Sequence, residues 1–100
     1  MRYAAMDIGG TFIKYACMDG EGVFLCAGQV PIDSNGSRED ILSAIDAAFA
    51  HLRAAVTRVD RTAVSIPGPF DYAAGVSLMT HKFASIYQFN LKSFLESYGA

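Results

Sequence analysis

The sequence has 100 residues, which is the length of one small domain. Apolar residues make up 52% and charged residues only 18%, so the chain can build a core, and disordered and collagen-like proteins are excluded. The net charge is −2 and the basic residues are scattered, which argues against nucleic acid as a partner.

The apolar runs are too short for a membrane protein. The longest one, residues 23–27, is far shorter than the roughly 20 residues that a membrane-spanning helix needs. Asp7 also interrupts the N-terminal segment before the apolar region of a signal peptide is complete. The sequence therefore predicts a cytoplasmic protein without membrane contact.

The first third of the chain predicts an antiparallel meander of three strands. Residues 3–8 are mostly apolar and end at Gly9-Gly10, and residues 11–18 and 23–30 are two further strand-like runs. If Gly20 and Glu21 form the loop, Cys17 lies diagonal to Cys26 on one face, about 7 to 8 Å apart. This spacing favours two reduced, packed thiols over a disulfide.

The middle of the chain predicts a helix from Ser37 to about Arg58. Ser37 and Asp40 resemble a capping box. Apolar residues follow at the spacing of one helical face, namely Ile41, Ile45, Ala48, Phe49, Leu52, Val56 and Val59. Residues 62–66 predict a further strand, which we expect to be parallel to the first because a helix intervenes.

The last third is less regular. Pro67-Gly68-Pro69 ends the fourth strand, and residues 75–82 predict a short extended piece or an irregular loop. Residues 90–98 predict a final helix that Asn90 caps and that ends at Gly99.

The most specific motif is Asp7-Ile8-Gly9-Gly10-Thr11. A carboxylate at the end of a buried strand can approach a hydrated Mg²⁺. The glycines let backbone N–H groups come close to a phosphate, and the Thr11 hydroxyl adds a donor. The same residues also suit a plain hairpin turn, and Lys14 is either a phosphate contact or a solvated lysine on the strand.

Two motifs together make the sequence similar to the ROK family of sugar kinases and related repressors. They are residues 6–14, MDIGGTFIK, and residues 64–71, VSIPGPFD, followed by Gly75. The resemblance spans nearly all of the chain. It implies an α/β fold of the ribonuclease-H-like, actin-like ATPase class, as an N-terminal lobe in which the meander, the helix and the parallel strand form a mixed sheet.

The resemblance also implies the site residues. Asp7, Gly9, Gly10 and Thr11 are expected to contact the phosphates of ATP, with Asp7 also at Mg²⁺, and Gly68 is expected on the sugar side. The chain departs from the family at Phe12, where a Lys or another polar residue is common, and at residues 81–87, where the family has a sugar-holding Asn. His81 in that stretch is a candidate for sugar contact, and the alternative is a surface or capping role.

The 100 residues lack several parts that the family's kinases use. The catalytic Asp, expected shortly after Ala100, is not among them, nor are the zinc motif and the second phosphate loop. The resemblance therefore implies the N-terminal lobe of an ATP-dependent, glucokinase-like hexose kinase, which would be inactive by itself.

Two other functions stay open. A repressor of the same family normally carries a DNA-binding domain before the first strand, whereas here that strand begins at residue 3, which favours the kinase. A non-catalytic binding or assembly module would also explain the high apolar content. We expect a homo-oligomer, because a lobe without its partner exposes apolar surface.

Overall fold

The computed structural model describes residues 1–56 and 58–98. Gly99, which the sequence predicts as the end of the last helix, lies outside the described residues. The elements in chain order are β1 (Arg2–Ile8), β2 (Phe12–Asp19), β3 (Phe24–Pro31), α1 (Arg38–Ala55), β4 (Arg61–Ser65), β5 (Phe70–Asp71), β6 (Val76–Ser77), the 3₁₀ turn η1 (Ala84–Ile86) and α2 (Leu91–Glu96).

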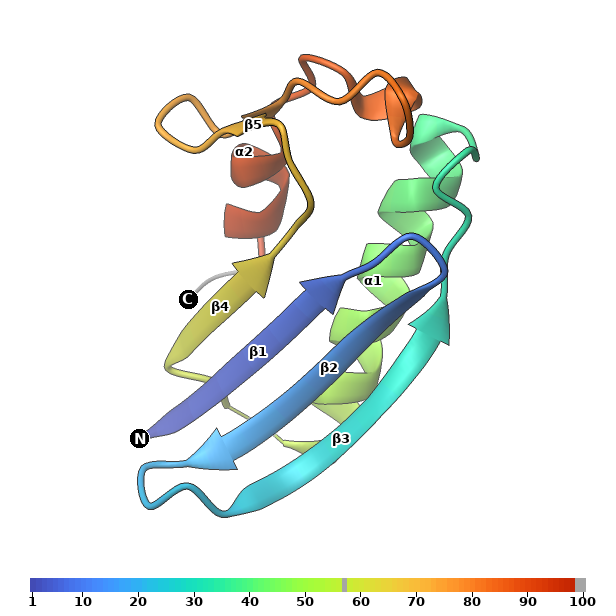
Figure 1. Ribbon diagram of the computed structural model, residues 1–100. Helices are drawn as coiled ribbons and strands as arrows, with labels where there is room; N and C mark the ends of the chain where they lie inside the picture. The colour runs from blue at the N-terminus through green and yellow to red at the C-terminus, as the bar shows by residue number, and fades with distance from the viewer. Residues whose placement is uncertain (57, 99–100) are drawn as a thin grey trace.

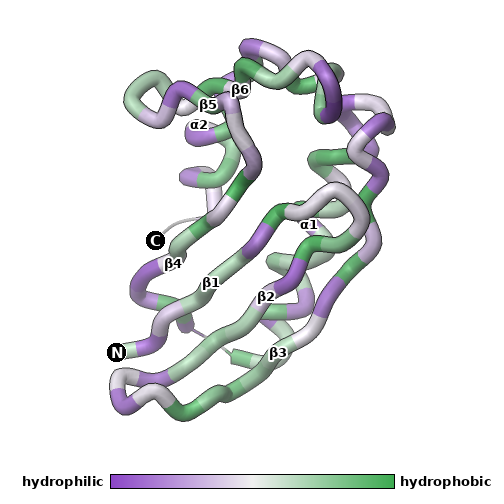
Figure 2. Tube along the Cα trace, viewed as in Figure 1, coloured by the Kyte–Doolittle hydropathy of each residue, from purple (hydrophilic) through white to green (hydrophobic). Residues whose placement is uncertain are grey.

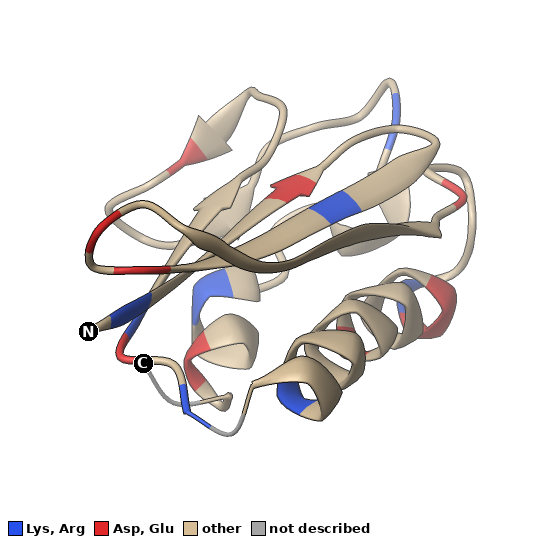
Figure 3. Cartoon of the chain, turned by 90° about the horizontal axis from the view of Figure 1, so that it is seen from below, with Lys and Arg blue, Asp and Glu red and all other residues tan. Residues whose placement is uncertain are grey.

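The first four strands form one mixed sheet. Its strand order is β3-β2-β1-β4. The β3–β2 and β2–β1 pairs are antiparallel, and the β1–β4 pair is parallel. Both helices lie on the same side of this sheet, and its other face is open (Figures 1 and 3). The predicted meander, helix and parallel strand are therefore confirmed.

The alternation of side chains along β1 separates a buried face from the open face. Ala4, Met6 and Ile8 are buried under α1, whereas Ala5 and Asp7 are exposed on the other face. Apolar residues run along the strands, and polar residues gather at the turn between β2 and β3 (Figure 2). The core lies between the sheet and α1, whose buried residues are Ile41, Ile45, Ala48, Phe49 and Leu52.

The loop between β2 and β3 corrects the predicted pairing of the two cysteines. Cys17 lies directly opposite Cys26, not diagonal to it, because the loop is longer than two residues and the register shifts between Cys17 and Met18. The Asp19 carboxylate accepts hydrogen bonds from the N–H groups of Glu21 and Val23 and so stabilises the longer loop. Both cysteines are free, as predicted.

The capping box of α1 is confirmed, but the helix ends earlier than predicted. The Ser37 hydroxyl accepts from the Asp40 N–H, and the Asp40 carboxylate accepts from the Ser37 N–H. At the other end Val56 is already extended. Beyond it, Arg58 forms an ion pair with Asp60, and the Asp60 carboxylate accepts a hydrogen bond from the Arg2 N–H, so this segment leads into β4 instead of continuing the helix.

The end of the chain forms a short hairpin and α2. β5 and β6 pair with each other as a separate ribbon, so the predicted extended piece is limited to Val76–Ser77. Asn90 caps α2 as predicted, since its side chain accepts from the Ser93 N–H. No helix within the described residues combines the length and the apolarity that crossing a membrane requires.

Candidate functional site

Asp7 lies near the end of β1 on the open face of the sheet. Its neighbours across the sheet are Lys14 on β2 and Ser65 on β4. All three residues are exposed, and a shallow depression of about 370 Å³ runs past them over small side chains, among them Ala5 and Ala16. In the described part of the chain Asp7 and Lys14 form no ion pair with each other, so both charges face solvent.

The turn after β1 distinguishes the two glycines of the motif. The Gly9 N–H donates to the Phe12 carbonyl at 3.0 Å, and a Cβ at Gly9 would lie 2.9 Å from the same oxygen. A Cβ at Gly10 would meet no atom within 4 Å. The fold itself therefore requires a glycine at position 9, whereas at position 10 the space beside the backbone is open.

The fold brings the two sequence motifs to the same end of the sheet. Because β4 is parallel to β1 and Ser65 pairs with Asp7, the chain leaves both strands at one end, and Gly68 follows three residues after Ser65. The bond between Gly68 and Pro69 is cis. Asp71, in the strand that follows, accepts a hydrogen bond from the Ala74 N–H, which fits a role in stabilising the turn.

His81 lies on a different segment from the phosphate motif. It is exposed in the loop between β6 and η1. This loop is tied to the start of α1, since the Phe83 N–H donates to the Ser34 carbonyl at 2.7 Å. The structure thus brings Asp7, Gly9, Gly10 and Thr11 together in one strand and turn, with Gly68 at the same sheet end and His81 apart from them.

The donors at the motif fit a magnesium ion only in part. Within residues 1–56 and 58–98, no three His, Cys, Asp or Glu side chains come together as a metal site. A single carboxylate nevertheless suits Mg²⁺, which keeps several waters and takes its other ligands from substrate phosphates. Asp7 has the exposure and the oxygen donors for that single position.

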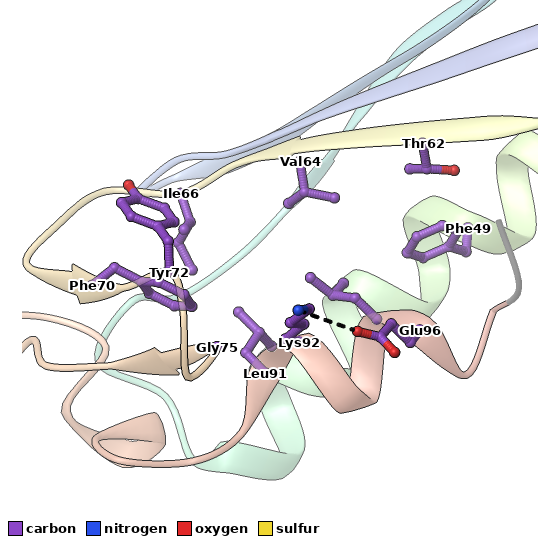
Figure 4. Close-up of a pocket in the computed structure, with 11 residues that line it drawn as sticks. Phe49, Thr62, Val64, Ile66, Phe70, Tyr72, Gly75, Leu91, Lys92 and Glu96 are labelled. Atoms are coloured by element: carbon purple, nitrogen blue, oxygen red, sulfur yellow. Dashed lines mark ion pairs between the residues drawn. The ribbon is translucent and has the colours of Figure 1, made fainter.

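A second cavity, of about 280 Å³, lies on the helix side of the sheet between β4 and α2 (Figure 4). Aromatic and aliphatic side chains line most of it, and Lys92 and Glu96 form an ion pair of 3.9 Å at α2. None of the residues that the motifs predict for phosphate, metal or sugar lines this cavity. Four of its lining residues, Val64, Ile66, Phe70 and Gly75, come from the second motif and the glycine after it.

Sequence reasoning missed the position of Ser65 and left that of Lys14 undecided. Both join the site because of strand register, as they are the two cross-strand neighbours of Asp7. The predicted hairpin of residues 3–8 and 11–18 pointed toward Lys14, and the prediction that residues 62–66 are parallel to the first strand pointed toward Ser65. Neither prediction gave the register.

Comparisons with known proteins show which solved structures share this fold. Neither the protein-family models nor the curated proteins give a match. Among solved structures, a ROK family glucokinase from Streptomyces griseus, in complex with glucose and AMPPNP, superposes with a TM-score of 0.78 and 26% identity over 97% of this chain. The ROK hexokinase of Thermus thermophilus gives a TM-score of 0.70 and 27% identity over 98% of this chain.

A third neighbour has the same fold at lower identity. The inorganic polyphosphate/ATP-glucomannokinase of Arthrobacter sp. strain KM gives a TM-score of 0.76 and 23% identity over 97% of this chain. The chain spans 30%, 32% and 40% of the lengths of these three proteins. The resemblance to ROK family sugar kinases is thereby confirmed, and so is the predicted α/β fold class.

Proposed function

We propose that this chain, whose fold is that of part of a ROK family sugar kinase, is the N-terminal lobe of an ATP-dependent kinase for a hexose or a hexose derivative. The observation that carries the proposal is the convergence of the two motifs at one sheet end, where Asp7 pairs with Ser65. A structural neighbour at 26% identity was solved with glucose and AMPPNP, which supports a sugar and ATP as ligands.

Each residue of the turn has its own part in holding ATP. The Gly9 N–H is already bonded to Phe12, so Gly9 contributes the shape of the turn. Gly10 lies in open space, so its N–H and that of Thr11 are the donors that we assign to phosphate oxygens, together with the Thr11 hydroxyl. Lys14 adds a positive charge on the same face, next to Asp7.

Asp7 is the residue that we assign to Mg²⁺. When bound, the ion neutralises part of the charge on the phosphate oxygens during phosphoryl transfer. The Asp7 carboxylate fixes the ion at the end of β1, close to the turn that receives the phosphates. In this proposal the negative charge of Asp7 holds the metal ion, and the positive charge of Lys14 attracts the phosphate.

We assign the sugar side to the Pro67-Gly68-Pro69 loop and to His81. Both follow β4 in the chain. Gly68 comes three residues after Ser65, so it lies beyond the same end of the sheet as the turn after β1. His81 is exposed and carries ring nitrogens that can bond to sugar hydroxyls. The reaction also needs a base that takes the proton from the attacking hydroxyl, and we propose that residues outside these 100 supply it.

The proposed protein acts in the cytoplasm, where ATP is available. The two cysteines of the described residues are free, as suits a reducing compartment. We also expect these 100 residues by themselves not to phosphorylate a sugar, because the base and the second lobe that closes on the nucleotide are not among them.

The experiment that tests the proposal is a chimera. The matching segment of the Streptomyces griseus glucokinase is replaced by this chain, and ATP-dependent phosphorylation of glucose is measured. We expect activity that Asp7→Asn lowers at least about a hundredfold, since it removes the metal carboxylate. Glu39→Gln, which removes an exposed charge on α1, is the control and should keep the activity. A folded chimera that is inactive, or one that Asp7→Asn leaves unchanged, would contradict the proposal.

A further inference from the structure

The segment between β6 and α2 has an unusual backbone. Phe83 and Gln88 have φ angles of 54° and 61°, in the left-handed region that residues other than glycine rarely adopt. Such conformations persist only where the surrounding contacts enforce them, and they are frequent at binding sites. Contacts around the segment must therefore hold Phe83 and Gln88 in this conformation.

Two kinds of contact hold the segment. Phe83 and Ile86 are fully buried and anchor it from within. Main-chain hydrogen bonds fix its ends, from the Phe83 N–H to the Ser34 carbonyl and from the Gln88 N–H to the Ser77 carbonyl. These anchors leave the exposed outer side of the segment without support from the core.

Arg38 supplies that support. Its Nε donates to the Ser85 carbonyl at 3.3 Å, and its guanidinium carbon lies 4.7 Å from the centre of the Phe89 ring. Arg38 is the first residue of α1, where the helix dipole disfavours a positive charge. The helix dipole therefore does not favour an arginine at this position, whereas the segment gains a planar donor that bridges Ser85 and Phe89.

The loop that leads into α1, residues 32–37, also contacts the turn after β1. The Ile32 N–H donates to the Thr11 carbonyl at 2.9 Å, and two residues later the Ser34 carbonyl accepts from Phe83. The residues that lead into α1 thus connect the turn after β1 to segment 83–89, which begins two residues after His81. Arg38 lies where this connection meets the helix.

We propose that Arg38 is a positioning residue, which holds segment 83–89 in its strained conformation beside the start of α1. Its use in sugar binding rests on the proposed function. The proposal concerns a contact between residues 47 apart in the sequence, and it does not require Arg38 to touch a ligand.

The test is amide hydrogen exchange, measured by NMR on the whole chain. The reporters are the N–H groups of Ile86, Tyr87, Gln88 and Phe89, which all donate to carbonyls at this segment or at Ser77. Arg38→Lys keeps the charge and removes the planar contact, and we expect exchange at these four positions to become about tenfold faster, with β1 and β2 unchanged. Phe89→Leu should have the same effect, and combining the two substitutions should add little.

Arg53→Lys is the matched control. Arg53 lies on the same helix and its guanidinium stacks on the Tyr98 ring at 5.0 Å, so its replacement should loosen the C-terminal end and not segment 83–89. Unchanged exchange at the four reporters in Arg38→Lys would overturn the proposal. Equal acceleration throughout the sheet would overturn it too, since Arg38 would then act on global stability only.

Titration with D-glucose separates this proposal from the proposed function. If both are right, glucose shifts the amide signals of the segment, and Arg38→Lys weakens the affinity while Arg53→Lys does not. If glucose causes no shift in the unmodified chain but the local exchange result holds, the positioning role stands and the assignment of the sugar side fails. If glucose binds equally well to Arg38→Lys and the exchange is unchanged, the positioning role fails by itself.

Discussion

Gly9 and Gly10 are adjacent in the sequence, but they are glycines for different reasons. A side chain at Gly9 would collide with the Phe12 carbonyl, and that carbonyl cannot move without breaking the turn. A Cβ at Gly10 would meet no atom within 4 Å. The fold therefore explains Gly9, and under the proposed function a phosphate that approaches the backbone explains Gly10.

This difference predicts opposite outcomes for two alanine substitutions. Gly9→Ala should destabilise the protein by about 1 to 3 kcal/mol, because the new methyl group has no room. Gly10→Ala should change the free energy of unfolding by less than about 0.5 kcal/mol but should weaken ATP binding. Urea unfolding and nucleotide titration of both variants test this. A destabilised Gly10→Ala would show that the turn, not a ligand, requires that glycine.

Tyr98, which follows α2, packs against α1. The Tyr98 ring stacks on Phe49, with ring centres 4.0 Å apart, and meets Phe94 edge to face. Its hydroxyl donates to the Asp46 carboxylate at 2.8 Å. Burial, the hydrogen bond to Asp46 and the charge of that carboxylate together raise the pKa of Tyr98 to about 12.

The raised pKa predicts a loss of stability at high pH. In the unfolded chain a tyrosine has a pKa of about 10, so the contribution of Tyr98 is complete below that pH and is lost as the pH rises toward 12. Tyr98→Phe should lower the free energy of unfolding by about 0.5 to 1.5 kcal/mol at pH 8, and the difference from the unmodified chain should shrink above pH 10. The measurement is urea unfolding across pH. Tyr72→Phe, at a largely exposed position, is the control, and a difference that stays constant with pH would contradict the account.

Local sequence signals predicted the elements that local physics determines. The capping box at Ser37 and the spacing of Ile41 and Ile45 predicted α1, because both depend on residues within a few turns of each other. The length of the loop after Asp19 was wrong in the prediction, since it depends on a side chain that bonds to two backbone groups. The left-handed Phe83 had no local signal, because contacts distant in sequence enforce it.

The candidate site shows the same division. The motif itself predicts that Asp7, Gly9, Gly10 and Thr11 lie together, since they are neighbours within one strand end and turn; their contact with ATP stays a prediction. The place of Ser65 follows from the pairing of β4 with β1, which a sequence predicts only as a direction and not as a register. Arg38 depends on a contact across 47 residues and is visible only in the structure.

At the scale of the whole molecule, the open face of the sheet exposes apolar surface that neither α1 nor α2 covers. Large apolar side chains are exposed at the end where β1 begins, among them Tyr3, Phe24 and Leu25. Charged residues are few on the strands and more frequent on the helices and loops (Figure 3). If the chain is one lobe of a kinase, this surface is where we expect it to contact further protein.

We therefore predict that the chain by itself associates with other copies. Sedimentation velocity over a series of concentrations should show a mass that rises with concentration, because exposed apolar surface favours association. Replacing both Phe24 and Leu25 by Ser should shift the chain toward the monomer. Tyr72→Ser, which removes an exposed aromatic residue from the turn after β5, should not. A monomer at the highest concentration would contradict this prediction, because the exposed apolar surface would then not be enough to cause association.

An NMR titration of the chain with AMPPNP, with and without Mg²⁺, tests whether the turn after β1 binds ATP. We expect the amide signals of Gly10 and Thr11 to shift and Mg²⁺ to strengthen the affinity. Under the proposed function the affinity is weak, because the other lobe that closes on ATP lies outside these 100 residues. Asp7→Asn should abolish the effect of Mg²⁺ and leave the fold intact. If AMPPNP shifts no signals in this turn, or if Asp7→Asn responds to Mg²⁺ as the unmodified chain does, then the turn is a plain hairpin and the chain is not the ATP-binding lobe of a kinase.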